Sequence, residues 1–184
     1  MAISSCRLHS CRKLASATAT LLVLLGMASC KKSPELGEVY ETWEASNDQF
    51  RVRVRAFYEH SQFLSGGYLL YEAAPRGTDR WQQIMGFRHD DPIKIPHDSV
   101  RFVSDKIGYV FLGWKCAVTN DAGQTWSVWN AEKDVPNWSC CNYGLIREVE
   151  LSVQGRGKMA LHPIPGRNEP EVLMTEDYGK HWHR

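Results

Sequence analysis

The sequence lacks the motifs that mark several familiar classes of enzyme. It contains no Gly-x-Ser-x-Gly elbow, no His-Glu-x-x-His pair and no glycine-rich phosphate loop. Helix-period stripes longer than two turns and low-complexity tracts are also missing. The sequence therefore predicts a protein that is not an enzyme, and we expect neither a cofactor nor a metal.

The chain also lacks a large net charge of either sign. It carries 22 basic and 21 acidic residues. Three of the basic residues lie in the first 29 positions, so the remainder carries 19 basic against 21 acidic residues, a charge of −2. Nucleic-acid-binding domains normally show a basic face and a high pI. The near balance argues against a nucleic-acid partner.

A long hydrophobic run is missing as well. The uncharged run at residues 14–27 has 14 residues, whereas a membrane-spanning helix needs about 20. Such a run suits the apolar region of a secretory signal, because basic residues precede it. These basic residues are Arg7, Arg12 and Lys13.

The run ends in a sequence that resembles a bacterial lipobox, Met27-Ala28-Ser29-Cys30. This resemblance implies a lipoprotein signal peptide over residues 1–29, with Cys30 lipidated and becoming the mature N-terminus. The alternative is an ordinary signal peptide that is cut nearby, with Cys30 playing no part. Several acyl chains hold a protein durably on a membrane.

The predicted lipid anchor places the protein in the bacterial cell envelope, facing the periplasm. Residues 30–38 predict a lipidated cysteine followed by a short polar tether, and residues 39–184 predict a single β-domain. Lys31 favours the outer membrane, whereas Lys32-Ser33 resembles a retention signal for the inner membrane. The choice of membrane therefore stays open.

Three cysteines remain after the leader and the lipidated cysteine: Cys116, Cys140 and Cys141. In an oxidising compartment, one disulfide from Cys116 to either of the other two is expected. It would close a loop of roughly 25 residues and contribute on the order of 3 kcal/mol. A zinc site with His181 or His183 is an alternative, but the chain offers no Cys-x-x-Cys pair for it.

Apolar residues follow the period of strands along the whole domain. Residues 50–57 alternate apolar and basic side chains, as a strand with one solvated face does. Further strands are expected at residues 68–71, 100–102, 108–114, 117–118, 126–129, 149–153, 158–161 and 172–174. Tryptophans at positions 81, 126 and 182 close three units, and their spacings of 45 and 56 residues suit four-stranded blades.

Two stretches of the chain share one pattern, 56 residues apart. Residues 119–126 (the first box) and residues 175–182 (the second box) both read Thr-x-Asp-x-Gly-x-(Thr/His)-Trp. The pattern resembles the Asp-box (BNR) turn between the outer strands of blades in sialidase-like β-propellers, and residues 76–81 resemble a decayed third copy. The resemblance implies an all-β fold of antiparallel strands in about three blade-like β-meander units, as a partial propeller or a sandwich.

Each residue type in the boxes has a structural reason to be there. The aspartates accept bonds from nearby backbone N–H groups, the glycines allow a positive φ, and the tryptophans pack on strands. The residues concerned are Thr119, Asp121, Gly123, Trp126, Thr175, Asp177, Gly179 and Trp182. The boxes therefore predict a scaffold. A sialidase would need about six blades, and three units in 155 residues are too few.

The alternating strand carries Arg51, Arg53 and Arg55 on one face. One interpretation is a solvated strand face that discourages edge-to-edge pairing. The other is a docking surface for an acidic partner, because arginine is favoured at protein interfaces.

The layout of lipobox, short tether and β-domain with degenerate Asp boxes is similar to that of immunity lipoproteins of type VI secretion, which are paired with phospholipase effectors. This similarity implies a protein that binds a secreted toxic effector and blocks its active site. The first alternative is an assembly factor or scaffold for an envelope complex. The second is a carbohydrate-binding surface module, for which Trp129 and Trp138 are the candidate residues.

Overall fold

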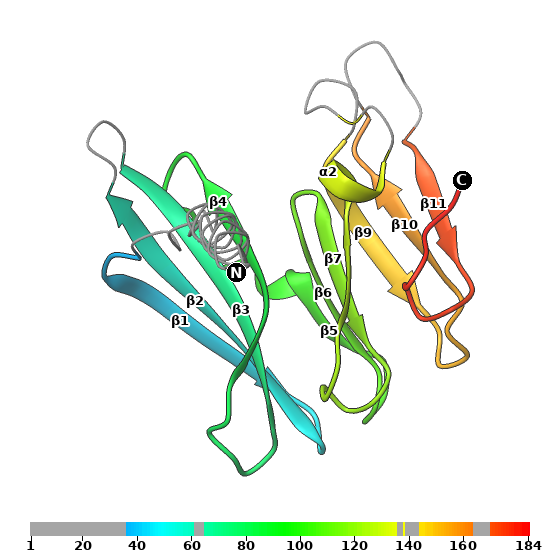
Figure 1. Cartoon of the computed structure of the whole chain (residues 1–184), viewed down its shortest axis with the longest axis horizontal. Helices are drawn as coiled ribbons and strands as arrows, with labels where there is room; N and C mark the ends of the chain where they lie inside the picture. The colour runs from blue at the N-terminus through cyan, green and yellow to red at the C-terminus, as the bar shows by residue number, and fades with distance from the viewer. Residues whose placement is uncertain (1–35, 61–64, 136–137, 139–143, 164–169) are drawn as a thin grey trace, which may run out of the picture. The chain divides into compact units, whose positions relative to one another are not determined.

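The computed structural model describes residues 36–60, 65–135, 138, 144–163 and 170–184 (Figure 1). These residues form an all-β fold of antiparallel strands in three sheets, as the sequence predicted. Cys30 and the leader lie outside the described residues, as do Cys140 and Cys141. Lipidation and the disulfide therefore stay predictions, although Cys116 is a free thiol in this structure.

Each sheet is a meander in which every strand pairs with the next one along the chain. The first sheet consists of β1 (Val39–Ser46), β2 (Phe50–His60), β3 (Ser65–Pro75) and β4 (Gln82–His89). The second consists of β5 (Val100–Phe102), β6 (Gly108–Leu112), β7 (Lys115–Thr119) and β8 (Ser127–Asn130). The third consists of β9 (Ile146–Leu151), β10 (Gly157–Leu161) and β11 (Val172–Thr175). Two short helices are η1 (His97–Ser99) and α2 (Ala131–Asp134).

The second sheet is apolar on both faces, and this explains how the sheets pack. Val110 and Ala117 belong to a core cluster with residues of the first sheet. Their neighbours Tyr109, Cys116 and Val118 belong to a second cluster with residues of the third sheet. Successive side chains of a strand point to opposite faces, so an apolar residue at nearly every position gives a sheet that is covered on both sides.

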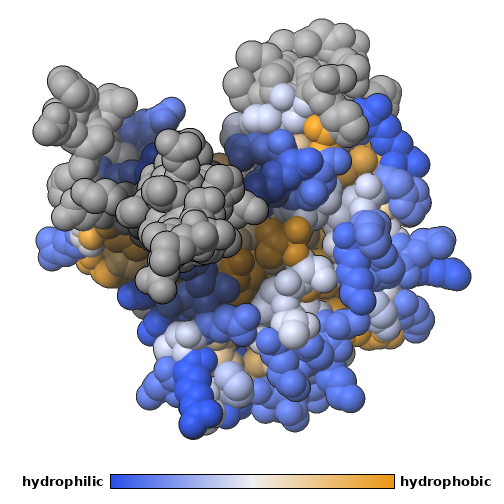
Figure 2. All heavy atoms as spheres, viewed as in Figure 1, coloured by the Kyte–Doolittle hydropathy of each residue, from blue (hydrophilic) through white to orange (hydrophobic). Residues whose placement is uncertain are grey.

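The domain contains a complete core of its own. All members of both clusters lie between Tyr40 and Trp182, inside the compact unit Leu36–Arg184. Figure 2 shows hydrophilic side chains along the lower and right edges of this view, and apolar residues at its centre and left. We therefore expect residues 31–184 to fold without the leader.

The three box-like stretches occupy equivalent places in the three sheets. The first box connects β7 to β8, and residues 76–81 connect β3 to β4. The second box follows β11 and leads to His183, which forms an isolated antiparallel bridge with Met174. Each turn thus follows the third strand of its meander, where the resemblance to blades had placed it.

The stretch at residues 76–81 is nevertheless built differently from the two boxes. The Thr78 N–H donates to the Pro75 carbonyl oxygen at 3.2 Å, and Gly77 has a φ of +77°. This is a tight turn with glycine in its left-handed position. The stretch occupies the place of a box but is held by different bonds, because the Thr-x-Asp register is lost there; its interpretation as a decayed Asp box stays a prediction.

Candidate functional site

The first box is held by the side chains of its threonine and aspartate. Thr119 Oγ1 donates to Asp121 Oδ1 at 2.8 Å and accepts from the Gly123 N–H at 3.0 Å. Asp121 accepts from the backbone N–H of Thr125 at 2.9 Å and from its hydroxyl at 2.5 Å. Trp126 Nε1 donates to the Gly123 carbonyl at 3.2 Å. The box is a closed set of local bonds.

The second box repeats the threonine and aspartate bonds with one chemical change, but its tryptophan bond is not repeated, because the buried Trp182 Nε1 has no hydrogen-bond partner among the described residues. Thr175 Oγ1 lies 2.9 Å from Asp177 Oδ1 and 3.0 Å from the Gly179 nitrogen. His181 takes the place of the last threonine. Its backbone N–H donates to Asp177 Oδ1 at 3.0 Å, and its ring Nδ1 lies 2.6 Å from Oδ2. The imidazole therefore supplies the same contact as the hydroxyl of the first box.

Both boxes contain a second left-handed residue that the motif does not reveal. The expected glycines have positive φ, +79° at Gly123 and +72° at Gly179. The residues before them, Ala122 and Tyr178, also have positive φ, +59° and +61°. A left-handed alanine or tyrosine costs energy, which the side-chain bonds of each box offset.

The carboxylates of the boxes are stabilised in their charged form. Burial raises the pKa of Asp177, but bonds from His181 and Thr175 outweigh it and bring the pKa down to about 2. At Asp121 burial likewise raises the pKa, and bonds chiefly from Thr125 and Thr119 lower it overall. Because these oxygens are engaged inside the turns, the boxes act as scaffold.

Two other candidate residues lie inside the core. Cys116 on β7 is 1 % exposed, and burial raises the pKa of its thiol. Trp129 on β8 is 5 % exposed and packs in the second cluster, so its ring cannot stack on a carbohydrate. Trp138 is partly buried and packs edge-to-face on Trp114, with their ring centroids 5.2 Å apart.

Arg51, Arg53 and Arg55 form an arginine ladder on β2, and their side chains make ion pairs and hydrogen bonds within the first sheet. Glu72 on β3, whose side chain is 9 % exposed, accepts from Arg53 Nε at 3.1 Å and from Arg55 Nε at 2.8 Å. A second bond joins Arg55 Nη2 to the other carboxylate oxygen of Glu72 at 3.0 Å. Arg51 pairs with Asp79 at 3.0 Å and also donates to the carbonyl of Thr78.

Trp81 covers part of the same ladder. The guanidinium carbons of Arg53 and Arg51 lie 4.0 and 4.7 Å from its ring centroid, within the range of cation–π contacts. Arg55 lies 5.1 Å from the ring of Phe57 in the same way. The ladder is thus a network of paired and stacked cations, which favours a structural role for it over a docking surface.

The outer face of the third sheet is open by comparison. Val172 and Met174 on β11 are 42 % and 45 % exposed. Ala160 lies opposite Val172 on β10, and Lys158 lies opposite Met174. We call this surface, made by Ala160, Lys158, Val172 and Met174, the Met174 face. Exposed apolar residues that lie side by side mark interaction sites more often than scattered ones do.

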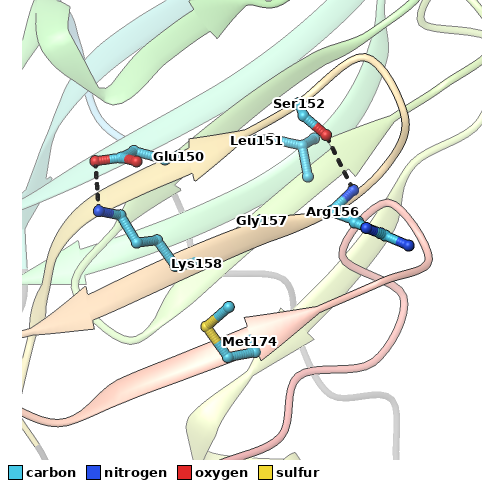
Figure 3. A pocket seen from close by; sticks show the side chains of 7 residues that line it. All are labelled: Glu150, Leu151, Ser152, Arg156, Gly157, Lys158 and Met174. Carbon is cyan, nitrogen blue, oxygen red and sulfur yellow. Dashed lines mark hydrogen bonds and ion pairs between the residues drawn. The ribbon is translucent and has the colours of Figure 1, made fainter.

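A shallow hollow of about 380 Å³ lies at one end of the Met174 face (Figure 3). Its lining residues come from all three strands and from the hairpin between β9 and β10: Glu150, Leu151, Ser152, Arg156, Gly157, Lys158 and Met174. Gly157 has no room for a side chain, because a Cβ there would lie 2.4 Å from the Glu150 carbonyl oxygen and 2.9 Å from Leu151 Cδ1.

A second hollow, of about 450 Å³, is lined by residues of η1, β5, β6 and β9. Arg101 and Arg147 line it together with Asp98, Glu148 and Glu150. Tyr109 lines one side, and its hydroxyl donates to the Val149 carbonyl at 2.5 Å. Burial raises the pKa of Tyr109 to about 12. With two basic and three acidic side chains, this hollow has no cation to spare for an acidic partner.

Within the described residues, no group of three or more His, Cys, Asp or Glu side chains could hold a metal ion. The described part of the chain also contains no helix long and apolar enough to cross a membrane. No protein-family model, no curated protein and no solved structure matches this chain.

Sequence reasoning missed the residues that distinguish the two outer faces. Glu72 is the single acidic residue in the otherwise apolar strand β3. An isolated acidic residue in the strand that follows the three arginines of β2 could have indicated an ion pair with them. Met174 gave no such signal, because a run of Val, Leu and Met reads as a buried strand. Its exposure depends on which sheets lie beside β11.

Proposed function

We propose that this protein is a lipid-anchored, periplasm-facing binding module, an immunity protein that neutralises a lipase-type effector of type VI secretion. The observation that carries the proposal is the Met174 face, where Val172 and Met174 are exposed next to a hollow with charged walls. Such apolar patches with polar rims are typical of protein-binding sites.

The leader pattern supports the same proposal. A lipid on Cys30 and a short tether would hold the domain close to the membrane that a lipase attacks. Anchoring raises the local concentration of an inhibitor at that surface. Inhibition by binding needs no catalytic group, and it fits a domain whose box carboxylates are already engaged in turns.

A competition assay between two strains tests this function. A strain lacking the gene is mixed with its parent, whose secretion apparatus is either active or disabled. We expect the mutant to be killed only by the parent whose secretion apparatus is active. The wild-type gene should restore its survival. Rescue by a Cys30→Ala gene should be weaker, because the inhibitor is no longer held at the membrane.

A biochemical experiment must agree with the genetic one. Purified residues 31–184 should form a one-to-one complex with the secreted hydrolase and abolish its lipase activity at equal molar amounts. Equal survival of the mutant beside active and disabled parents would contradict the proposal. An envelope defect that persists without any secretion apparatus would instead favour the assembly-factor alternative.

A further inference from the structure

The fold leaves the outer face of the third sheet open. Both faces of the second sheet are packed in the two core clusters, as are the inner faces of the first and third sheets. The outer face of the first sheet is occupied by its paired and stacked arginines. The Met174 face carries no comparable cover among the described side chains.

The hollow beside Met174 has an apolar part and a cationic part. Met174 and Leu151 provide the apolar lining, and Gly157 lies between them without a side chain (Figure 3). Leu151 is partly buried and also packs against the second core cluster. A methionine thioether adapts to partners of different shape and makes favourable contacts with aromatic rings. The apolar part is therefore suited to one side chain of a partner.

The cations around the hollow are unequal in their pairing. Lys158 Nζ lies 3.0 Å from Glu150, and this hydrogen bond raises the pKa of Lys158. Arg156 uses its backbone N–H to donate to Ser152 Oγ at 3.2 Å. Its exposed guanidinium forms no ion pair with any residue that the structure describes. The hollow therefore has one cation to spare for a carboxylate.

We propose that this hollow receives an apolar side chain of the protein partner that has a carboxylate beside it, and that Arg156 binds the carboxylate. The apolar group would pack on Met174 and Leu151, the arrangement in which a few buried anchors supply most of the binding energy. Arginine presents several N–H donors in a planar fork that matches a carboxylate. This inference rests on the proposed function and adds the chemistry of its docking site.

Methyl NMR on residues 31–184 tests the inference directly. This segment contains three methionines, of which Met85 and Met159 are buried and Met174 is exposed. With ¹³C-methyl methionine, Met174 reports on the hollow, while the two buried methyls report that the fold is intact. The probes are acetyl-Asp-Phe-Asp-amide and acetyl-Lys-Phe-Lys-amide, which share the aromatic ring and differ in charge.

We expect the acidic peptide to shift the Met174 signal with an affinity on the order of 1 mM and to leave the buried methyls unchanged. The basic peptide should bind at least about tenfold more weakly. Arg156→Glu should reverse this preference. Lys133→Glu on α2 changes the net charge by the same amount and should leave the preference for the acidic peptide unchanged.

Three results of this NMR experiment would overturn the inference. They are an equal response to both peptides, a Met174 signal that moves with protein concentration alone, and a response to phosphatidylglycerol vesicles in place of the acidic peptide. The last two would assign the face to a second copy or to a membrane. Full protection of a strain carrying Arg156→Glu would also overturn it while leaving the proposed function intact, whereas failure of the wild-type gene to protect would contradict the function itself.

Discussion

The outer faces of the first and third sheets both lack a covering sheet among the described residues, yet their side chains are arranged differently. On the first, Glu72 and Trp81 hold three arginines in a network of ion pairs and ring contacts. On the third, Met174 is 45 % exposed beside an ion pair whose two side chains are about half exposed. One face is closed by its own side chains, and the other is left available.

The difference shows what a stacked array of sheets requires at its ends. A sheet inside the array has both faces covered by its neighbours, and a terminal sheet must cover its outer face or present it to a partner. Glu72 and Trp81 provide the first solution, and Met174 is suited to the second. The comparison predicts that substitutions on the first face affect stability and that those on the third affect binding.

The largest expected effect follows removal of Glu72. Glu72→Leu leaves Arg53 and Arg55 facing each other without their shared carboxylate, and should lower the free energy of unfolding by about 2–3 kcal/mol. The matched substitution Glu150→Leu on the third sheet should change it little, because that pair is exposed. Urea denaturation at pH 7 measures both. Equal losses in the two variants would show that the two faces contribute equally to stability.

A smaller effect is expected from Trp81. Trp81→Ala removes the ring that contacts Arg51 and Arg53, and should cost about 1–2 kcal/mol. Trp81→Phe should recover part of this loss, because an aromatic face remains. Met174→Ala on the open face serves as the control and should leave the urea midpoint nearly unchanged. If Met174→Ala costs as much as Trp81→Ala, the Met174 face is part of the stabilising core.

The sequence was sufficient to predict the strands whose side chains alternate and the turns whose residues make local bonds. The pattern at residues 50–57 lies within β2, and the residues of each box form the turn that they predicted. These features depend on neighbours a few positions away. Because such contacts are local, the motif alone specifies them.

Features that depend on distant pairing could not be predicted in the same way. Strands β1 and β4 were missed, since VYETWEAS alternates only from Thr42 onward and QQIMGFRH alternates poorly. The role of Glu72 depends on the register that places it opposite Arg53. The exposure of Met174 depends on the absence of a covering sheet among the described residues, which no local pattern encodes.

The pH dependence of the third sheet should show a further small effect. The pKa of Asp177 is about 2 in the folded protein, below its ordinary value of 3.8. A lowered pKa stabilises the folded state above the ordinary value, and this contribution is lost as the pH falls through about 2. Asp177→Asn should therefore lose less stability than the wild type between pH 4 and 2. Parallel thermal unfolding curves for both proteins would contradict the bonding seen in the second box.

The smallest effect on stability, and the largest on binding, is expected at Met174. Met174→Gln exchanges an exposed thioether for an amide of similar length, so the urea midpoint should stay where it is. Binding of the acidic peptide should weaken, because the apolar wall of the hollow is lost. Val128→Gln, at a residue that is 47 % exposed on β8, provides a control with the same chemistry elsewhere. Peptide titrations of both variants, read from the chemical shifts of backbone amides, separate the two outcomes. Equal weakening by both would mean that general surface hydrophobicity, and not the Met174 face, governs binding.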